Sequence, residues 1–175
     1  MIEILSEQEQ EPSSYPGQPS DLSTEAAELD TETLWKRIES FIRYRWNERT
    51  VTWIVQGPGV FHPRLQPFTL DSSEVWQDGE WVETTLDPAP LGFTLDTATY
   101  RITGTVGTAD SVPSDLEEAY RRLAEYLADG LYFGRVATSG NDDFGDASER
   151  FKRPEAWHGK ALYLSGAADL LRRWR

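Results

Sequence analysis

The 175-residue chain has the length of one domain with a spare segment, and a hydrophobic content of 38% with seven tryptophans excludes global disorder. Its net charge of -13 argues against a protein that wraps around nucleic acid, because neutralising phosphates needs a basic surface. It does not argue against a position beside DNA, since an acidic surface repels the phosphates and lets a duplex slide past without binding. The absence of cysteine excludes disulfides and thiolate chemistry and fits a protein made in a reducing cytosol.

The first 30 residues predict an acidic, extended arm. Residues 1–34 hold nine acidic and no basic side chains, and residues 6–22 are rich in Glu, Gln, Ser and Pro. Such a composition does not support a core of its own. The acidic start also lacks the basic region of a signal peptide, and no apolar run approaches the roughly 20 residues of a membrane helix. We therefore expect no contact with a membrane.

A helix is predicted to begin at Asp21 or Thr31, with residues 31–47 as its main part. Leu34, Ile38 and Phe41 recur at spacings of four and three, and Asp30 or Thr31 offers the N-cap. The helix is expected to end there because the β-branched and aromatic run 49–56 follows.

A small, mostly antiparallel sheet is predicted over residues 50–107. Asp78-Gly79 stands between two strand-like runs, 73–77 and 80–86, and is a strong hairpin signal. The runs 92–95 and 99–106 supply the last strands.

The sheet is followed by a second predicted helix over residues 114–129. Ser114 and Glu117 form a capping box, one face is apolar, and Gly130 stands where a helix often ends. Residues 134–153 predict a loop. A terminal helical segment is expected over 154–173, with a break near Ser165.

The histidines, serines, glycines and carboxylates that could serve in catalysis or ligand binding form no recognisable site. His62 and His158 have no partner at the spacing of a helical zinc pair. Four further patterns lack residues that their chemistry needs: the acidic turn 141–146, the glycine stretch 104–107, and the Ser-Gly pairs at 139–140 and 165–166. We predict no catalytic, cofactor or metal site and no enzyme. A hydrolase that uses convergent carboxylates or an oriented histidine is left as a rival class.

The tryptophans of the β section have two interpretations. Trp53, Trp76 and Trp81 lie on neighbouring predicted strands, where aromatic rings stack on sugars in carbohydrate-binding modules. Cross-strand packing explains Trp76 and Trp81 equally well, because they flank one tight hairpin. A carbohydrate-binding module is therefore the alternative function.

The order of elements resembles a known family. A helix, a small β section, the strand 99–106, the helix after Pro113 and the closing segment Gly166–Arg172 together resemble the head-tail connector, or adaptor, family of long-tailed bacteriophages, most closely the adaptors of alphaproteobacterial gene transfer agents. The resemblance covers residues 31–175 as one domain. It implies an α+β fold, in which a helical connector body has its small, mostly antiparallel β section inserted between N-terminal and C-terminal helices.

The resemblance implies a structural virion protein in the particle neck, assembled in the host cytoplasm. Members form a homo-oligomeric ring, usually a dodecamer, beneath the portal protein, and a stopper or tail-terminator protein follows below. DNA passes through the channel without specific binding, and no cofactor is needed. The basic end of the chain would then bind the portal; it consists of Leu170, Leu171, Arg172, Arg173, Trp174 and Arg175. Deleting it is expected to leave a folded subunit that fails to join heads to tails.

Overall fold

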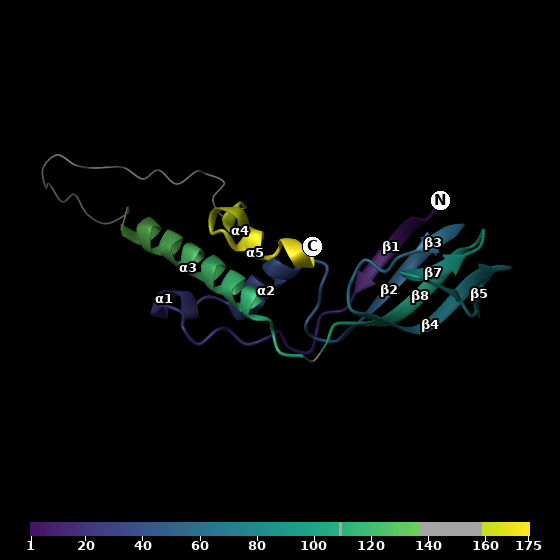
Figure 1. Cartoon of the computed structure of the whole chain (residues 1–175), viewed down its shortest axis with the longest axis horizontal. Coiled ribbons are helices and arrows are strands. Elements are labelled where there is room, and N and C mark those ends of the chain that lie inside the picture. Colours follow the sequence, from purple (N-terminus) through teal and green to yellow (C-terminus); the bar gives the residue numbers. More distant parts are fainter. Residues whose placement is uncertain (109, 137–158) are drawn as a thin grey trace, which may run out of the picture. The chain divides into compact units, whose positions relative to one another are not determined.

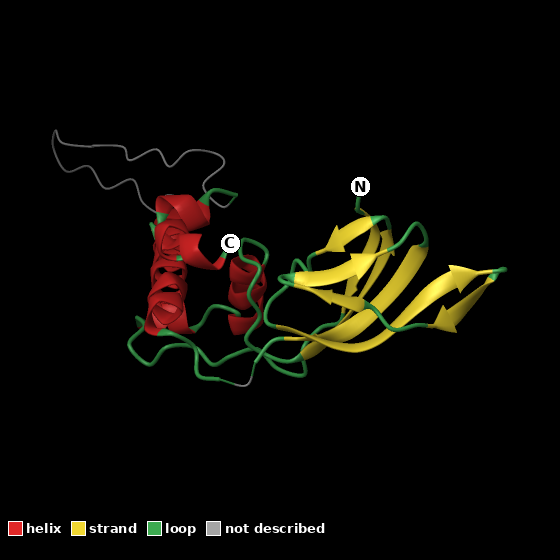
Figure 2. Ribbon diagram, turned by 45° about the vertical axis from the view of Figure 1, so that its right-hand side comes forward, coloured by secondary structure: helices red, strands yellow, loops and turns green. Residues whose placement is uncertain are grey.

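The computed structural model describes residues 1–108, 110–136 and 159–175, and groups them into two compact units. The sheet unit comprises residues 1–16 and 43–111, and the helical unit comprises residues 17–42 and 112–175. Strands make up the first and helices the second, as Figure 2 shows. The sequence predicted instead an arm over 1–30 and a single domain over 31–175. The structure groups the residues differently, because the chain alternates between the two units.

The sheet unit contains two antiparallel sheets, and Figure 1 labels all of their strands except β6. The larger sheet has the order β1 (Glu3–Glu9), β2 (Arg49–Gln56), β8 (Thr99–Val106), β4 (Phe68–Gln77) and β5 (Glu80–Glu83). The smaller sheet has the order β3 (Gly59–Phe61), β7 (Gly92–Leu95) and β6 (Asp87–Ala89). Buried residues alternate with partly exposed ones along β2 and β8, as expected for strands with one face in a core.

One hydrophobic core joins the two sheets. Trp53 of β2 lies fully buried at its centre, with the ring of Phe61 from the smaller sheet at 5.6 Å and that of Phe68 at 5.2 Å. Both contacts are edge-to-face, a favourable geometry for aromatic pairs. The predicted hairpin at Asp78-Gly79 is confirmed, with φ of 50° and 89° at its two turn residues.

The predicted acidic arm is partly built into the larger sheet. Residues 3–9 form β1, an edge strand paired with β2. Glu9 binds the buried guanidinium groups of Arg45 and Arg49 at 2.6 and 3.1 Å, and Glu7 accepts a hydrogen bond of 2.8 Å from Nε1 of Trp53. These contacts stabilise the strand against the rest of the sheet unit.

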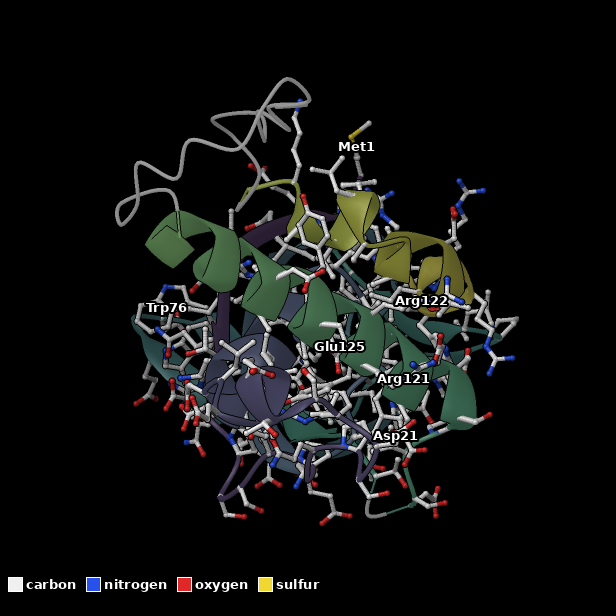
Figure 3. The ribbon with its side chains drawn as sticks, turned by 90° about the vertical axis from the view of Figure 1, so that its left-hand side faces the viewer. Met1, Asp21, Trp76, Arg121, Arg122 and Glu125 are labelled. Atoms are coloured by element: carbon white, nitrogen blue, oxygen red, sulfur yellow. The ribbon has the colours of Figure 1, made fainter. Side chains whose placement is uncertain are left out.

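The helical unit is built on α3 (Ser114–Val136). Its shorter elements are α1 (Thr24–Ala27), α2 (Thr31–Glu39), α4 (Ala161–Leu164), α5 (Ala167–Leu170) and the 3-10 turn η1 (Arg172–Trp174). The ring of Trp35 on α2 lies 5.1 Å from that of Tyr120 on α3, and both side chains are buried. Ser23, the N-cap of α1, donates from its backbone N and its Oγ to the carboxylate of Glu125, both at 2.7 Å; Figure 3 labels Glu125 on α3.

The predicted fold class is wrong. The described residues form mostly β structure, eight strands in two antiparallel sheets, with α3 and several shorter helices, and not a helical connector body with a small β section. One reason is that α2 ends at Glu39 and not near residue 47, since Tyr44 leaves the helix to form a bridge with Gln66. Another is that residues 3–9 add a strand to the larger sheet.

The C-terminal helices differ in length from their predictions. The helix predicted over 114–129 is confirmed and continues through residue 130 to Val136. In the described part of the segment 154–173 the helix is broken at Gly166, whose φ is 75°. The remainder of that segment, and most of the predicted loop 134–153, lie outside the described residues.

Candidate functional site

Most of the predicted portal-binding segment makes contacts within the helical unit. Leu171 is fully buried. Asp115, in the first turn of α3, accepts hydrogen bonds of 2.8 Å from Nη2 of Arg173 and 3.0 Å from Nε1 of Trp174. A helix end that would fray in isolation is thus held by a carboxylate far away in the sequence. The basic end therefore needs no external partner to be ordered.

The rest of the segment faces outward. The side chain of Arg172 is 80% exposed, with Asp169 at 3.0 Å as an equally exposed partner. The guanidinium of Arg175 lies 5.0 Å from the ring centre of Phe41, and that ring meets Tyr163 edge-on at 5.6 Å. We call the exposed and partly exposed residues of this region the terminal patch; they are Phe41, Tyr163, Leu164, Arg172 and Arg175. The patch combines aromatic rings with guanidinium groups, a composition enriched at protein interfaces.

The three tryptophans proposed for sugar binding do not form a common surface. Trp53 is fully buried in the core and has no face open to a ligand. Trp76 and Trp81 pair across the β4–β5 hairpin with ring centres 5.0 Å apart and planes at 63°. Arg101 of β8 lies over the ring of Trp81 at 4.7 Å. Only Trp76, which is 47% exposed, presents a large part of its indole to solvent.

An ion pair lies next to the Trp76–Trp81 pair. The guanidinium of Arg101 donates hydrogen bonds to both carboxylate oxygens of Glu74 on the neighbouring strand β4. These hydrogen bonds hold the pKa of Glu74 below its usual range. Glu74, Arg101, Trp81 and Trp76 thus form a continuous stack whose last member is exposed.

A cavity of about 510 Å³ opens on the same unit. It is lined by His62, Pro63, Gln66, Phe68, Leu91, Gly92 and Phe93. Its volume falls in the range of roughly 300 to 1,000 Å³ that is usual for small-molecule sites. The lining is mostly aromatic and aliphatic, so the cavity suits an apolar group better than a charged one.

The lining residues are held in place by specific contacts. Nδ1 of His62 lies 3.0 Å from the carbonyl oxygen of Leu91, which joins the two sides of the cavity. A Cβ at Gly92 would lie 2.0 Å from the carbonyl oxygen of Phe61, so only glycine permits this approach. A Cβ at Gly104 would lie 2.2 Å from Cε2 of Phe68. Local sequence could not predict the cavity, because its walls come from segments about 30 positions apart.

The other chemical patterns have structural explanations where they are described. Gly104 makes room for Phe68, and Gly107 has a φ of 105°, so the glycine stretch serves packing and backbone geometry. Ser165 Oγ bonds the backbone at the helix break. His158, the turn 141–146 and the pair 139–140 lie outside the described residues.

Within residues 1–108, 110–136 and 159–175, no group of three or more His, Cys, Asp or Glu side chains is arranged to hold a metal ion. Among the helices of the same ranges, none is both long enough and apolar enough to span a bilayer. Comparisons with protein-family models, curated proteins and solved structures find no match to this chain.

Proposed function

We propose that this chain is a structural protein of a tailed phage or gene transfer agent, a head-tail connector that forms a ring between the portal and the tail. One observation carries the proposal beyond the resemblance itself. The two segments that resemble connectors most, the helix after Pro113 and the closing segment, pack on one another through Asp115 and the buried Leu171. A sequence resemblance in two distant segments gains weight when those segments form one structural element.

The charge of the sheet unit supports a role beside DNA. Residues 1–16 and 43–111 hold 13 acidic and 5 basic side chains, a net charge of -8. Three of the five arginines have a carboxylate partner inside the unit: Arg45 and Arg49 bind Glu9, and Arg101 binds Glu74. A surface with this balance repels phosphates, which suits a channel through which a duplex passes without binding. This charge argument holds although the subunit does not have the helical connector body that the sequence predicted.

The portal contact is assigned to the terminal patch. Leu171, Arg173 and Trp174 bind within the helical unit, so Arg172 and Arg175 with the exposed Tyr163 and Leu164 remain for a partner. These residues form the contact surface in place of the whole segment 170–175.

The test measures mass by light scattering for the purified chain, alone and mixed with a purified portal ring of the same particle. We expect a complex with the portal, and its loss in Arg172→Glu. The matched control is Lys36→Glu, because Lys36 is also an exposed cation with a carboxylate partner one helical turn away, Glu32 at 2.7 Å. A wild-type chain indifferent to the portal would contradict the proposed function. A portal complex equally sensitive to both substitutions would contradict the assignment of the patch.

A further inference from the structure

The β4–β5 hairpin presents an exposed aromatic side chain on a rigid support. Pairing of β8 with β4 ends at Val75, so residues 76–81 extend past the last β4–β8 pair. Trp76 is 47% exposed there and is backed by Trp81, whose own ring is covered by Arg101. Because its neighbours already fix the indole, little conformational entropy is lost when a partner covers it.

The cavity lies at the opposite end of the same strand. Phe68, which lines it, begins β4, and Trp76 stands eight positions further along. At the usual rise of a β-strand this separation is roughly 26 Å. One strand of the sheet unit therefore has an exposed indole near one end and an apolar cavity at the other. Trp76 cannot enter the cavity of its own copy, because the length of β4 separates the two.

The charges around the two features are complementary. The turn of the hairpin carries the exposed carboxylates of Asp78 and Glu80. The cavity has no carboxylate among its lining residues, and the exposed Arg64 lies between two of them in sequence. Arg43, also exposed, accepts a 2.9 Å backbone hydrogen bond from Gln66 of the lining. A hairpin tip with two exposed carboxylates would thus meet an apolar cavity whose neighbouring residues in the chain include two exposed arginines.

We propose that Trp76 of one copy of this chain inserts into the cavity of a second copy, between Phe68, Phe93 and Leu91. A protrusion that fits a cavity elsewhere on the same molecule makes a heterologous contact, which repeats around a ring when its rotation closes. The occupant is a second copy, because the protrusion and a cavity of complementary chemistry lie on the same compact unit. The contact supplies the subunit interface that a connector ring needs, but it does not require the portal.

The test measures self-association of the full chain by sedimentation velocity over a concentration series. We expect wild type to associate and Trp76→Ala to weaken association about 30-fold, the size of an interface hot spot. Leu91→Glu, at a side chain that is 77% exposed, should have a similar effect by placing a carboxylate at the cavity. The controls are Val82→Ala on the other face of the hairpin and Leu5→Glu on β1, and both should associate like wild type.

A mixture of the two defective chains tests the direction of the contact. The cavity of the Trp76→Ala chain is intact and so is the indole of the Leu91→Glu chain, so an equimolar mixture should form pairs but no larger species. A charge exchange is independent of the hairpin's aromatic packing. Glu80→Lys and Arg64→Glu should each associate weakly alone, and their mixture should regain wild-type association.

Three outcomes would overturn the inference: a wild-type chain that stays monomeric at the highest concentration, association unchanged in Trp76→Ala, or defective chains that do not pair when mixed. The outcomes for the proposed function are separate. A chain that associates through Trp76 but ignores the portal contradicts the connector function alone. A portal-binding ring insensitive to Trp76 and Leu91 contradicts this contact alone.

Discussion

The role of Leu171 can be tested by truncating its side chain. Leu171 is fully buried where the closing segment meets α3, and its neighbour Leu170 on the same helical end is partly exposed. Removing buried methyl groups from leucine costs about 2–5 kcal/mol, because the lost burial is compounded by a cavity. Leu171→Ala should therefore lose about 2–5 kcal/mol of unfolding free energy, against less than about 1 kcal/mol for Leu170→Ala.

The assay is urea unfolding followed by the helical circular dichroism signal, with a thermal scan beside it. A domain of about 60–100 residues loses about 4–8 °C in Tm for each kcal/mol, so the Tm of Leu171→Ala should fall by about 8 °C or more. Equal midpoints for the two variants would refute the reasoning that the closing segment is part of the core. The result also bears on the deletion of residues 170–175, which removes Leu171 and is now expected to unfold the subunit partly. The single substitution at Arg172 is thus the cleaner test of partner binding.

Two further predictions concern the sheet unit. Gly104→Ala should lower its unfolding free energy by about 1–3 kcal/mol, because the new Cβ would overlap the Phe68 ring; Gly17→Ala, where a Cβ meets nothing within 4 Å, is the control, and equal Tm values would contradict the close packing. Glu74→Gln should make the unfolding free energy fall less steeply than in wild type as the pH is lowered. The pKa of Glu74 is lowered in the folded state, so its contribution is present above the ordinary glutamate pKa of about 4.3 and is lost as the pH falls through the folded value. Chemical denaturation between pH 7 and pH 3 measures this, and parallel pH profiles for wild type and variant would exclude a role for the Arg101 pair.

Local signals predicted the elements whose partners lie close in sequence. The capping box at Ser114 placed the start of α3, and Asp78-Gly79 placed the hairpin, because both depend on backbone geometry within a few residues. β1 was missed although Ile2 and Ile4 alternate with polar residues as in a strand. Its partners on β2 lie more than 40 positions away, and its acidic composition favoured a solvated arm.

The candidate surfaces depended on distant contacts and were predicted less well. Alternation assigns a residue to a face of a sheet but does not show which face another sheet covers, so Trp53 and Trp76 looked alike although one is buried and the other exposed. The basic end looked unpartnered because Asp115, which binds Arg173 and Trp174, stands 58 and 59 positions earlier.

The alternating path of the chain has a consequence for its synthesis. Each unit is made of two separate stretches, and the helical unit reaches from residue 17 to residue 175. A ribosome makes the chain in order, so the sheet unit has all its strands before α3 exists, whereas the helical unit waits for α5 and Leu171. A nascent chain interrupted before residue 167 would contain a complete sheet unit and an incomplete helical unit. Incomplete translation products would therefore retain Trp76 and the apolar cavity while lacking Arg172 and Arg175 of the terminal patch. They would compete with intact chains for a place in any assembly that the sheet units form.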